Sequence, residues 1–240
     1  MRNFNRKKNQ LRQIIIEKNF VENSHGSCLV SYGQTKVICT ATFSEEVPTW
    51  LKKEKSGWIT AEYAMLPTST SSRNPRESKI GKQSARSIEI QRLIGRSLRT
   101  IVDLKKIPGK QFILDCDVLQ ADGGTRTASI TGAFVALSLS INKLLAKKKI
   151  SKNPIKDFIA GVSCGIVNGE ILVDLDYLED SNAEVDANFV FTKNSGISEI
   201  QISGEKNPFP SNSIQKMIIS CEKAAKQIFE IQKRIISPVE

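Results

Sequence analysis

Strand-like segments occur in pairs along this chain, and each group of them is followed by a helix, an order that restricts the folds open to it. Residues 28–43 are apolar and β-branched on both sides of a Gly-Gln turn, which predicts a hairpin. An Asn-Gly pair at 168–169 predicts a second hairpin, and a further strand pair is expected about residues 194–196. This order favours an α+β fold, with a mixed β-sheet and flanking helices, over a regular parallel βαβ winding.

Three helices are expected around these strands. The first begins at Ser84, where apolar residues recur at helical spacing with arginines on another face. A strand at 112–119 leads through the turn QADGGTRT into a second, apolar helix, and a third runs from about residue 212 to 234. Residues 67–83 are rich in Ser, Thr, Pro and charge and are predicted to be a loop. Because no low-complexity linker divides the chain, a single domain over residues 1–240 is expected.

Composition excludes several classes of function. No apolar run approaches the ~18 residues of a membrane span, so we expect a soluble, cytoplasmic protein with no membrane partner. The five cysteines lie in apolar stretches without a CxxC pair and are expected to be buried free thiols. The only histidine, His25, excludes two-histidine ribonuclease chemistry and histidine-rich zinc sites. A Ser-His-Asp site would have to use His25, at the mouth of the first hairpin.

The net charge of +10 is concentrated in two segments. Residues 1–12 carry five Lys/Arg and no acid, and residues 73–99 carry eight Lys/Arg against two glutamates. The rest of the chain is close to neutral. Such clustering indicates a polyanion partner, with a solvated basic face as the alternative.

The turn GGTRT at 123–127 indicates a phosphate site. Its glycines allow close approach of the backbone to a ligand, and the helix that follows presents unpaired N–H groups that favour an anion. Arg126 adds a planar, permanently charged donor fork. The alternative is an ordinary strand-to-helix turn with a solvated arginine. A Walker motif is excluded, because GKQ at 81–83 lacks both the upstream glycine and the following Ser/Thr.

Carboxylates gather in a second constellation, which comprises Asp174, Asp176, Glu179, Asp180, Glu184 and Asp186. Hard oxygen ligands at this density suit Mg²⁺, and the alternative is an exposed acidic loop. A phosphate turn, an arginine-rich helix and a magnesium-capable cluster together indicate phosphoryl or nucleotidyl transfer on a polyanion.

Ordered blocks of sequence along nearly the whole chain resemble the ribonuclease PH family, the phosphate-dependent 3′ exoribonucleases that trim transfer RNA precursors. These blocks are QLR (10–12), GSCLVSYGQTKVICTA (26–41), GWITAEYAMLP (57–67), RNPRESKIGKQSARSIEIQRLIGRSLR (73–99), DCDVLQADGGTRTASITGAFVAL (115–137) and LDYLEDS (175–181). The resemblance implies the ribonuclease PH fold, which is like domain 2 of ribosomal protein S5, and the activity of a tRNA nucleotidyltransferase.

The resemblance also implies roles for individual residues. It implies that inorganic phosphate is the co-substrate, which attacks in place of water and releases nucleoside diphosphates. The residues implied to bind it are Arg86, Gly124, Thr125 and Arg126. Asp180 and Asp186 are the implied catalytic residues next to the scissile bond, binding Mg²⁺ or assisting proton transfer to the leaving 3′ oxygen.

The implied partners are RNA and further copies of the chain. The candidate RNA-binding residues are Arg73, Arg76, Arg92, Arg96 and Arg99, of which the last three are either RNA contacts or subunit contacts. Transfer RNA precursors are the expected substrate, with ribosomal RNA left open, and a homohexamer built as a trimer of dimers is expected. Thr68 stands where the family usually has arginine, so one RNA contact is expected to be lost. The alternative function is a catalytically inert RNA-binding ring subunit of the same fold.

Overall fold

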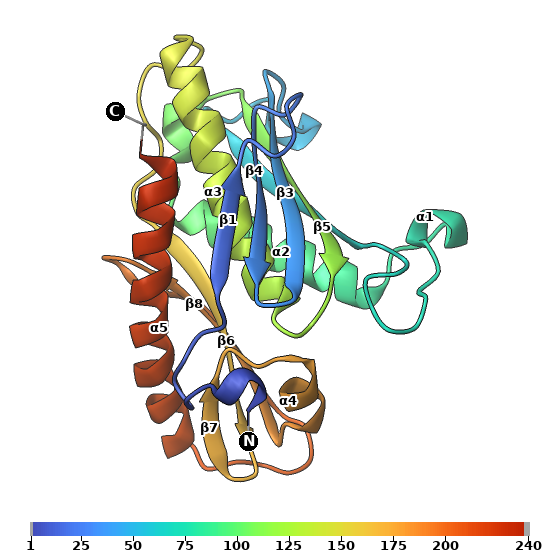
Figure 1. Cartoon of the computed structure of the whole chain (residues 1–240). Helices are drawn as coiled ribbons and strands as arrows, with labels where there is room; N and C mark the ends of the chain where they lie inside the picture. The colour runs from blue at the N-terminus through green and yellow to red at the C-terminus, as the bar shows by residue number, and fades with distance from the viewer. Residues whose placement is uncertain (1, 238–240) are drawn as a thin grey trace.

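The computed structural model describes residues 2–237, which form two β-sheets with helices between and beside them (Figure 1). The first sheet has the order β1 (Ile14–Lys18), β2 (Gly26–Tyr32), β3 (Thr35–Ser44), β5 (Gln111–Gln120) and β4 (Trp58–Met65). Only its β4–β5 pair is parallel. The second sheet is antiparallel, in the order β7 (Glu170–Val173), β6 (Ile159–Val167), β8 (Val185–Thr192) and β9 (Gly196–Gly204). The expected α+β fold is confirmed.

The helices are α1 (Glu77–Ile80), α2 (Ala85–Thr100), α3 (Thr125–Ala146), α4 (Tyr177–Asn182) and α5 (Asn212–Ile236), with 3-10 turns η1 (Asn3–Asn5), η2 (Thr49–Leu51) and η3 (Leu104–Lys106). The α2 helix begins as the sequence predicts, because the Ser84 side chain accepts a hydrogen bond from the Ser87 N–H and caps the helix. It packs on β4. The long α5 packs on the second sheet and runs along the left side of the molecule in Figure 1, from beside α3 down to β7.

The α3 helix lies between the two sheets, in contact with β2, β3 and β5 on one side and with β6 on the other. The close approach to β6 requires a glycine, because a Cβ at Gly161 would lie 2.8 Å from Thr127 Cα. Burial on both sides explains why α3 is apolar almost all round. By length and composition α3 could span a membrane, contrary to the expectation from the sequence, but 83% of its most apolar window is buried inside the protein. It is therefore the central core helix.

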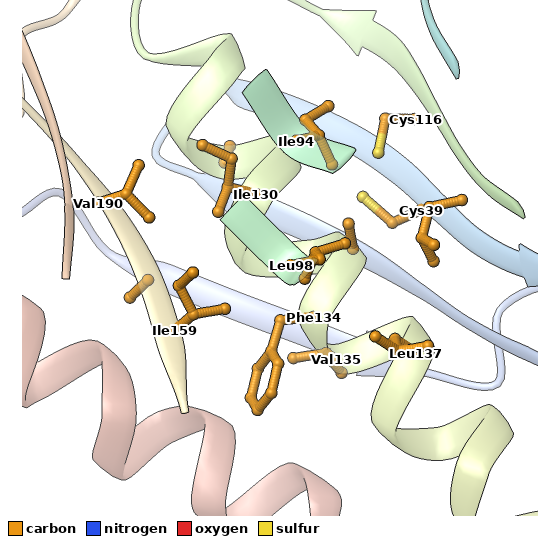
Figure 2. Close-up of a cluster of buried hydrophobic side chains, with 14 of the residues drawn as sticks. Cys39, Ile94, Leu98, Cys116, Ile130, Phe134, Val135, Leu137, Ile159 and Val190 are labelled. Carbon is orange, nitrogen blue, oxygen red and sulfur yellow. The ribbon is translucent and has the colours of Figure 1, made fainter. Parts of the chain in front are cut away.

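One cluster of buried apolar side chains joins both sheets through α3. Figure 2 shows part of it, with Ile130 and Phe134 of α3 between α2 residues such as Leu98 and second-sheet residues such as Ile159. All five cysteines are buried and free, as expected. This shared core joins the two sheets, and the single domain expected over residues 1–240 stays a prediction.

The predicted hairpins at 33–34 and 168–169 are both present, as are the three predicted helices. Two strands were missing from the sequence prediction. Residues 14–18 form β1 although they read as a short apolar run, and residues 58–65 form β4, whose partner β5 lies about fifty positions further along the chain. The predicted loop at 67–83 contains the short helix α1.

Candidate active site

The predicted phosphate site is a tight turn between β5 and α3. Gly123 and Gly124 have φ angles of +71° and +65°, a left-handed conformation that glycine adopts without strain. Gly124 is the N-cap of α3, so the N–H groups of its first turn have no partner four residues back and point out of the helix end. The local sequence dictates this geometry, and it presents the anion-binding end of a 22-residue helix. We call residues 122–126 the phosphate turn.

Arg86 approaches the phosphate turn from the first turn of α2. Its Nη2 lies 3.5 Å from Thr125 Oγ1, and the Tyr63 hydroxyl lies 2.9 Å from that same oxygen. Burial raises the pKa of Tyr63, while its contacts with Thr125 and Arg86 oppose the rise. Tyr63 therefore remains a neutral hydroxyl that orients the Thr125 side chain. Tyr63 was not among the predicted site residues, although the alternation along β4 places it on the buried face with Ile59 and Ala61.

Arg126 lies on the other side of the turn and is held by two neighbouring elements. Its Nη1 donates to Gln201 Oε1 of β9 at 2.9 Å and lies 3.3 Å from Glu89 Oε1 of α2. The side chain is only 15% exposed, so its guanidinium has a fixed position. Arg86 and Arg126 both act to lower the pKa values of Asp180 and Asp186, which places all four charged groups in one electrostatic environment.

The structure divides the six carboxylates that lie close together in the sequence, so they do not form one group. Asp174, Asp176 and Glu179 are buried and bound by arginines of the N-terminal segment. Their ion pairs include Arg2 Nε to Glu179 Oε1 at 2.7 Å, Arg6 Nη2 to Asp176 Oδ2 at 3.3 Å and Arg12 Nη2 to Asp174 Oδ1 at 2.7 Å. These three carboxylates support the fold and are not free to bind a metal ion. Glu184 Oε1 accepts a hydrogen bond from Gly169 N–H in the β6–β7 hairpin.

The same ion pairs correct the interpretation of the basic N-terminal segment as a polyanion contact. The side chains of Arg2, Arg6 and Arg12 are 8%, 4% and 3% exposed, so most of this charge is neutralised inside the protein. Lys8 pairs with Glu170 on the surface. In Figure 1 the N-terminal segment passes beside β7 and α4 before it enters the first sheet as β1. The arginines could not be matched to their partners from the sequence, because more than 160 residues separate them.

Asp180, Glu184 and Asp186 stay outside the arginine ion pairs, and Asp180 and Asp186 have raised pKa values. Burial raises the pKa of Asp180, although Arg86 and Arg126 oppose the rise. Burial, and then the charge of Asp180, raise the pKa of Asp186 to about 6, again against Arg126 and Arg86. The Asn188 side chain is a weak donor to Asp186, at 3.3 Å and 3.4 Å from its two carboxylate oxygens. A carboxylate whose pKa is raised by a second one beside it marks a site that a cation would stabilise.

No group of three or more His, Cys, Asp or Glu side chains suited to a metal ion occurs within residues 2–237. An all-protein metal cage is therefore absent from the described part of the chain. The pair Asp180 and Asp186 nevertheless fits Mg²⁺, which is usually bound through one or two carboxylates and completes its octahedron with water and substrate oxygens.

A cavity of about 1070 Å³ opens beside the phosphate turn. Its walls include Tyr63, Arg76, Arg86, Gly124, Thr125 and Asp180. Several of the predicted site residues therefore lie around one space. Arg126 and Asp186 are not part of its wall, although the charges of Asp180 and Arg86 reach Asp186. The cavity is large enough for several nucleotide-sized groups.

The predicted RNA-binding arginines divide into two groups. Arg73 and Arg76 are exposed on the loop before α2, and Arg92 is exposed on α2. Arg96 forms a two-point ion pair with Glu199 of β9, with contacts of 2.8 Å and 2.6 Å. Arg99 donates to the Ile59 carbonyl at 2.8 Å and stacks over the Trp58 ring at 4.4 Å. Contacts within the chain thus occupy Arg96 and Arg99.

His25 takes no part in the site. Its Nδ1 accepts a hydrogen bond from the Phe43 N–H at 3.1 Å, in the first sheet. Among the described residues that line the cavity there is thus no nucleophile–histidine pair, and the charged groups include arginines and carboxylates.

Comparisons with known proteins identify the family of the chain. The sequence matches the "3′ exoribonuclease family, domain 1" over residues 10–141 and "3′ exoribonuclease family, domain 2" over residues 157–220. It is 50% identical over 227 residues to a protein named Ribonuclease PH from Neisseria meningitidis serogroup C, and the match covers 95% of this chain and 94% of that protein.

Two solved structures share the fold. Rice (Oryza sativa) Rrp46 has a TM-score of 0.79 at 19% identity, and the match covers 98% of this chain and 100% of the Rrp46 chain. A chain of the Archaeoglobus fulgidus exosome with RNA bound to the active site has a TM-score of 0.79 at 22% identity, covering 95% and 92%. At these identities the likeness concerns the fold alone.

Proposed function

The chain belongs to the 3′ exoribonuclease family, and we propose that the cavity beside the phosphate turn is where it shortens RNA from the 3′ end. Identity of 50% with a ribonuclease PH over 95% of the chain makes it a phosphorolytic exoribonuclease, that is, a nucleotidyltransferase with inorganic phosphate as co-substrate. The observation that carries the assignment to this cavity is the meeting of Arg86, the phosphate turn and Asp180 around one space.

Orthophosphate binds, in this proposal, to the first-turn N–H groups of α3, to Thr125 Oγ1 and to the guanidinium groups of Arg86 and Arg126. One of its oxygens attacks the phosphorus of the last phosphodiester, the bond from that phosphorus to the 3′ oxygen breaks, and a nucleoside 5′-diphosphate leaves. Phosphate is already an anion, so positioning and charge neutralisation carry the reaction in place of a strong base. A cavity wall built of arginines and carboxylates, without histidine among its described residues, is consistent with this chemistry.

Asp180 and Asp186 face the leaving side of this reaction. We assign them to Mg²⁺, which would stabilise negative charge on the phosphoryl oxygens and on the 3′ oxygen. The raised pKa of Asp186, about 6, also leaves it able to exchange a proton near neutral pH. The two roles make different predictions, because only the first requires added metal.

RNA would enter past the exposed arginines of the loop before α2. Arg76 lines the cavity and Arg73 lies nearby in the sequence, so these two are the strongest candidates for backbone contacts, with Arg92 as a third. Transfer RNA precursors are the proposed substrate. A homohexamer would multiply these charges around a ring, and the resulting RNA affinity should fall steeply with salt.

The test is to incubate the protein with a transfer RNA that carries extra 3′ nucleotides, with and without inorganic phosphate and Mg²⁺. We expect nucleoside diphosphates only when phosphate is present. Release of monophosphates regardless of phosphate would mean hydrolysis and would overturn the mechanism. RNA binding without any product would favour the inert ring subunit.

A pair of variants assigns the activity to the cavity. Asp180→Asn should bind the RNA and leave it uncut. Asp103→Asn is the matched control, since Asp103 follows the far end of α2, whose last residue Thr100 lies about 21 Å from Arg86 by the helix rise. Activity in Asp180→Asn equal to that of the control would remove Asp180 from the reaction.

A further inference from the structure

The phosphate turn and the start of α4 touch each other, although about fifty residues separate them in sequence. The backbone N–H of Tyr177, the first residue of α4, donates to Asp122 Oδ1 at 3.2 Å. On the adjacent residue, a Cβ at Gly123 would lie 2.5 Å from the Leu175 carbonyl oxygen. The turn therefore lies directly against the segment that leads into α4.

This contact joins the two halves of the proposed reaction site. The phosphate turn belongs to the region that matches domain 1 of the family, and α4, with Asp180 one turn after Tyr177, belongs to the region that matches domain 2. The attacking phosphate and the carboxylate near the leaving oxygen are thus held by separate segments. Their spacing depends on whatever fixes one segment to the other.

Hydrogen bonds with β3 and with the N-terminal segment hold the backbone of Asp122 and Gly123 in place. The Asp122 N–H donates to Thr35 Oγ1 at 2.9 Å, and the Thr35 hydroxyl donates to the Gly123 carbonyl at 2.7 Å. The buried Arg12 guanidinium donates to the Asp122 carbonyl and is fixed by Asp174 at the end of β7. Asp122 is therefore a rigid support, and its carboxylate is the side-chain group that reaches the N-terminus of α4.

We propose that Asp122 is a positioning residue whose carboxylate ties the phosphate turn to the first turn of α4 and so sets the distance between bound phosphate and Asp180. This inference rests on the proposed function of the cavity. A carboxylate is suited to the task, because it accepts an N–H at the positive end of a helix. Small displacements matter at such a site, since a misplacement of about 1 Å can lower the rate by about 100-fold.

The test compares Asp122→Ala, which removes the acceptor, with Asp122→Asn, whose amide oxygen can still accept from Tyr177 N–H. We expect kcat for phosphorolysis to fall roughly 10- to 100-fold in the alanine variant and to recover to within about threefold of wild type in the asparagine variant. The RNA dissociation constant, measured without phosphate, should remain unchanged in both. Glu170→Ala, which removes a surface ion pair of the N-terminal segment, is the control and should match wild type.

Thermal unfolding of each variant identifies the fraction folded at the assay temperature, so that lost activity is not confused with lost fold. Wild-type kcat in folded Asp122→Ala, or equal losses in the alanine and asparagine variants, would overturn the proposal.

Hydrogen exchange gives a readout that does not depend on catalysis. The amides of residues 123–127 and 177–180 should exchange faster in Asp122→Ala only, and unchanged exchange there would also refute the tether. Failure of the proposed function would instead appear as wild-type protein without phosphate-dependent product.

Discussion

Replacing Asp186 with asparagine should make the protein more stable at neutral pH, although Asp186 belongs to the proposed active site. Burial and the neighbouring Asp180 raise the pKa of this carboxyl to about 6, from an ordinary value of 3.8. At about 1.4 kcal/mol for each pH unit, the charged carboxylate destabilises the fold by at most about 3 kcal/mol. Because Asp186 is partly exposed, solvent screening reduces this to about 1–2 kcal/mol.

The sign and pH window follow from the two pKa values. Below about pH 4 the carboxyl is protonated in the folded and the unfolded chain, and its stabilising proton is fully bound. That contribution is lost as the pH rises through 6, because the unfolded chain ionises first. The amide that replaces the carboxyl carries no charge at any pH, so the variant should exceed wild type in Tm by about 2–8 °C at pH 7.5. At pH 3, which is below both pKa values, the two should agree.

The assay is thermal unfolding followed by circular dichroism at several pH values in the presence of EDTA. Asp157→Asn is a control of opposite sign. Asp157 is 5% exposed and its carboxylate accepts hydrogen bonds from Phe158 N–H, Asn194 N–H, Asn194 Nδ2 and Ser195 Oγ, so its replacement should lower Tm. A Tm for Asp186→Asn that equals or falls below wild type at pH 7.5 would refute the reasoning. Added Mg²⁺ should stabilise wild type more than the variant and narrow the difference.

Three further predictions concern other parts of the structure. Arg126→Ala should raise the phosphate concentration needed for half-maximal rate while RNA affinity, measured by fluorescence anisotropy, stays the same; equal loss of both would make Arg126 an RNA contact. Asp174→Ala should lower the free energy of unfolding in urea by about 3–5 kcal/mol, because it removes the nearer of the two carboxylates that pair with the buried Arg12, and a loss below about 1 kcal/mol would contradict this. The native protein should leave all five cysteines unmodified by an aromatic disulfide reagent, whereas denaturant should expose five; rapid reaction of the native form would contradict their burial.

Sequence patterns predicted those parts of the fold that depend on local chemistry. The hairpin at 168–169 follows from its Asn-Gly pair, and α2 follows from apolar residues that recur at helical spacing after Ser84. The strand β4 was not predicted, because its identity depends on parallel pairing with β5 across a connection that includes α2. Pairing at such sequence separation leaves no short-range signal.

The site was predictable in a similar way. The phosphate turn can be predicted from the sequence because its glycines and its arginine are nearly consecutive. The division of the acidic cluster could not be predicted from the sequence. Asp174 and Asp180 are the same residue type six positions apart, and they differ only in which arginines lie near them. The contact between Asp122 and α4 could not be predicted either, because its donor is a backbone N–H group, which no residue type identifies in the sequence.

The position of α3 has a consequence for how the molecule comes apart. The α3 helix packs against both sheets. If the chain were cut in the connection at 147–156 and the two pieces separated, the aliphatic side chains of α3 that pack on the second sheet would be exposed to water. Neither fragment would have a complete hydrophobic core. We therefore expect both sheets to unfold in one cooperative step, so that the half with the phosphate turn and the half with Asp180 are never folded separately.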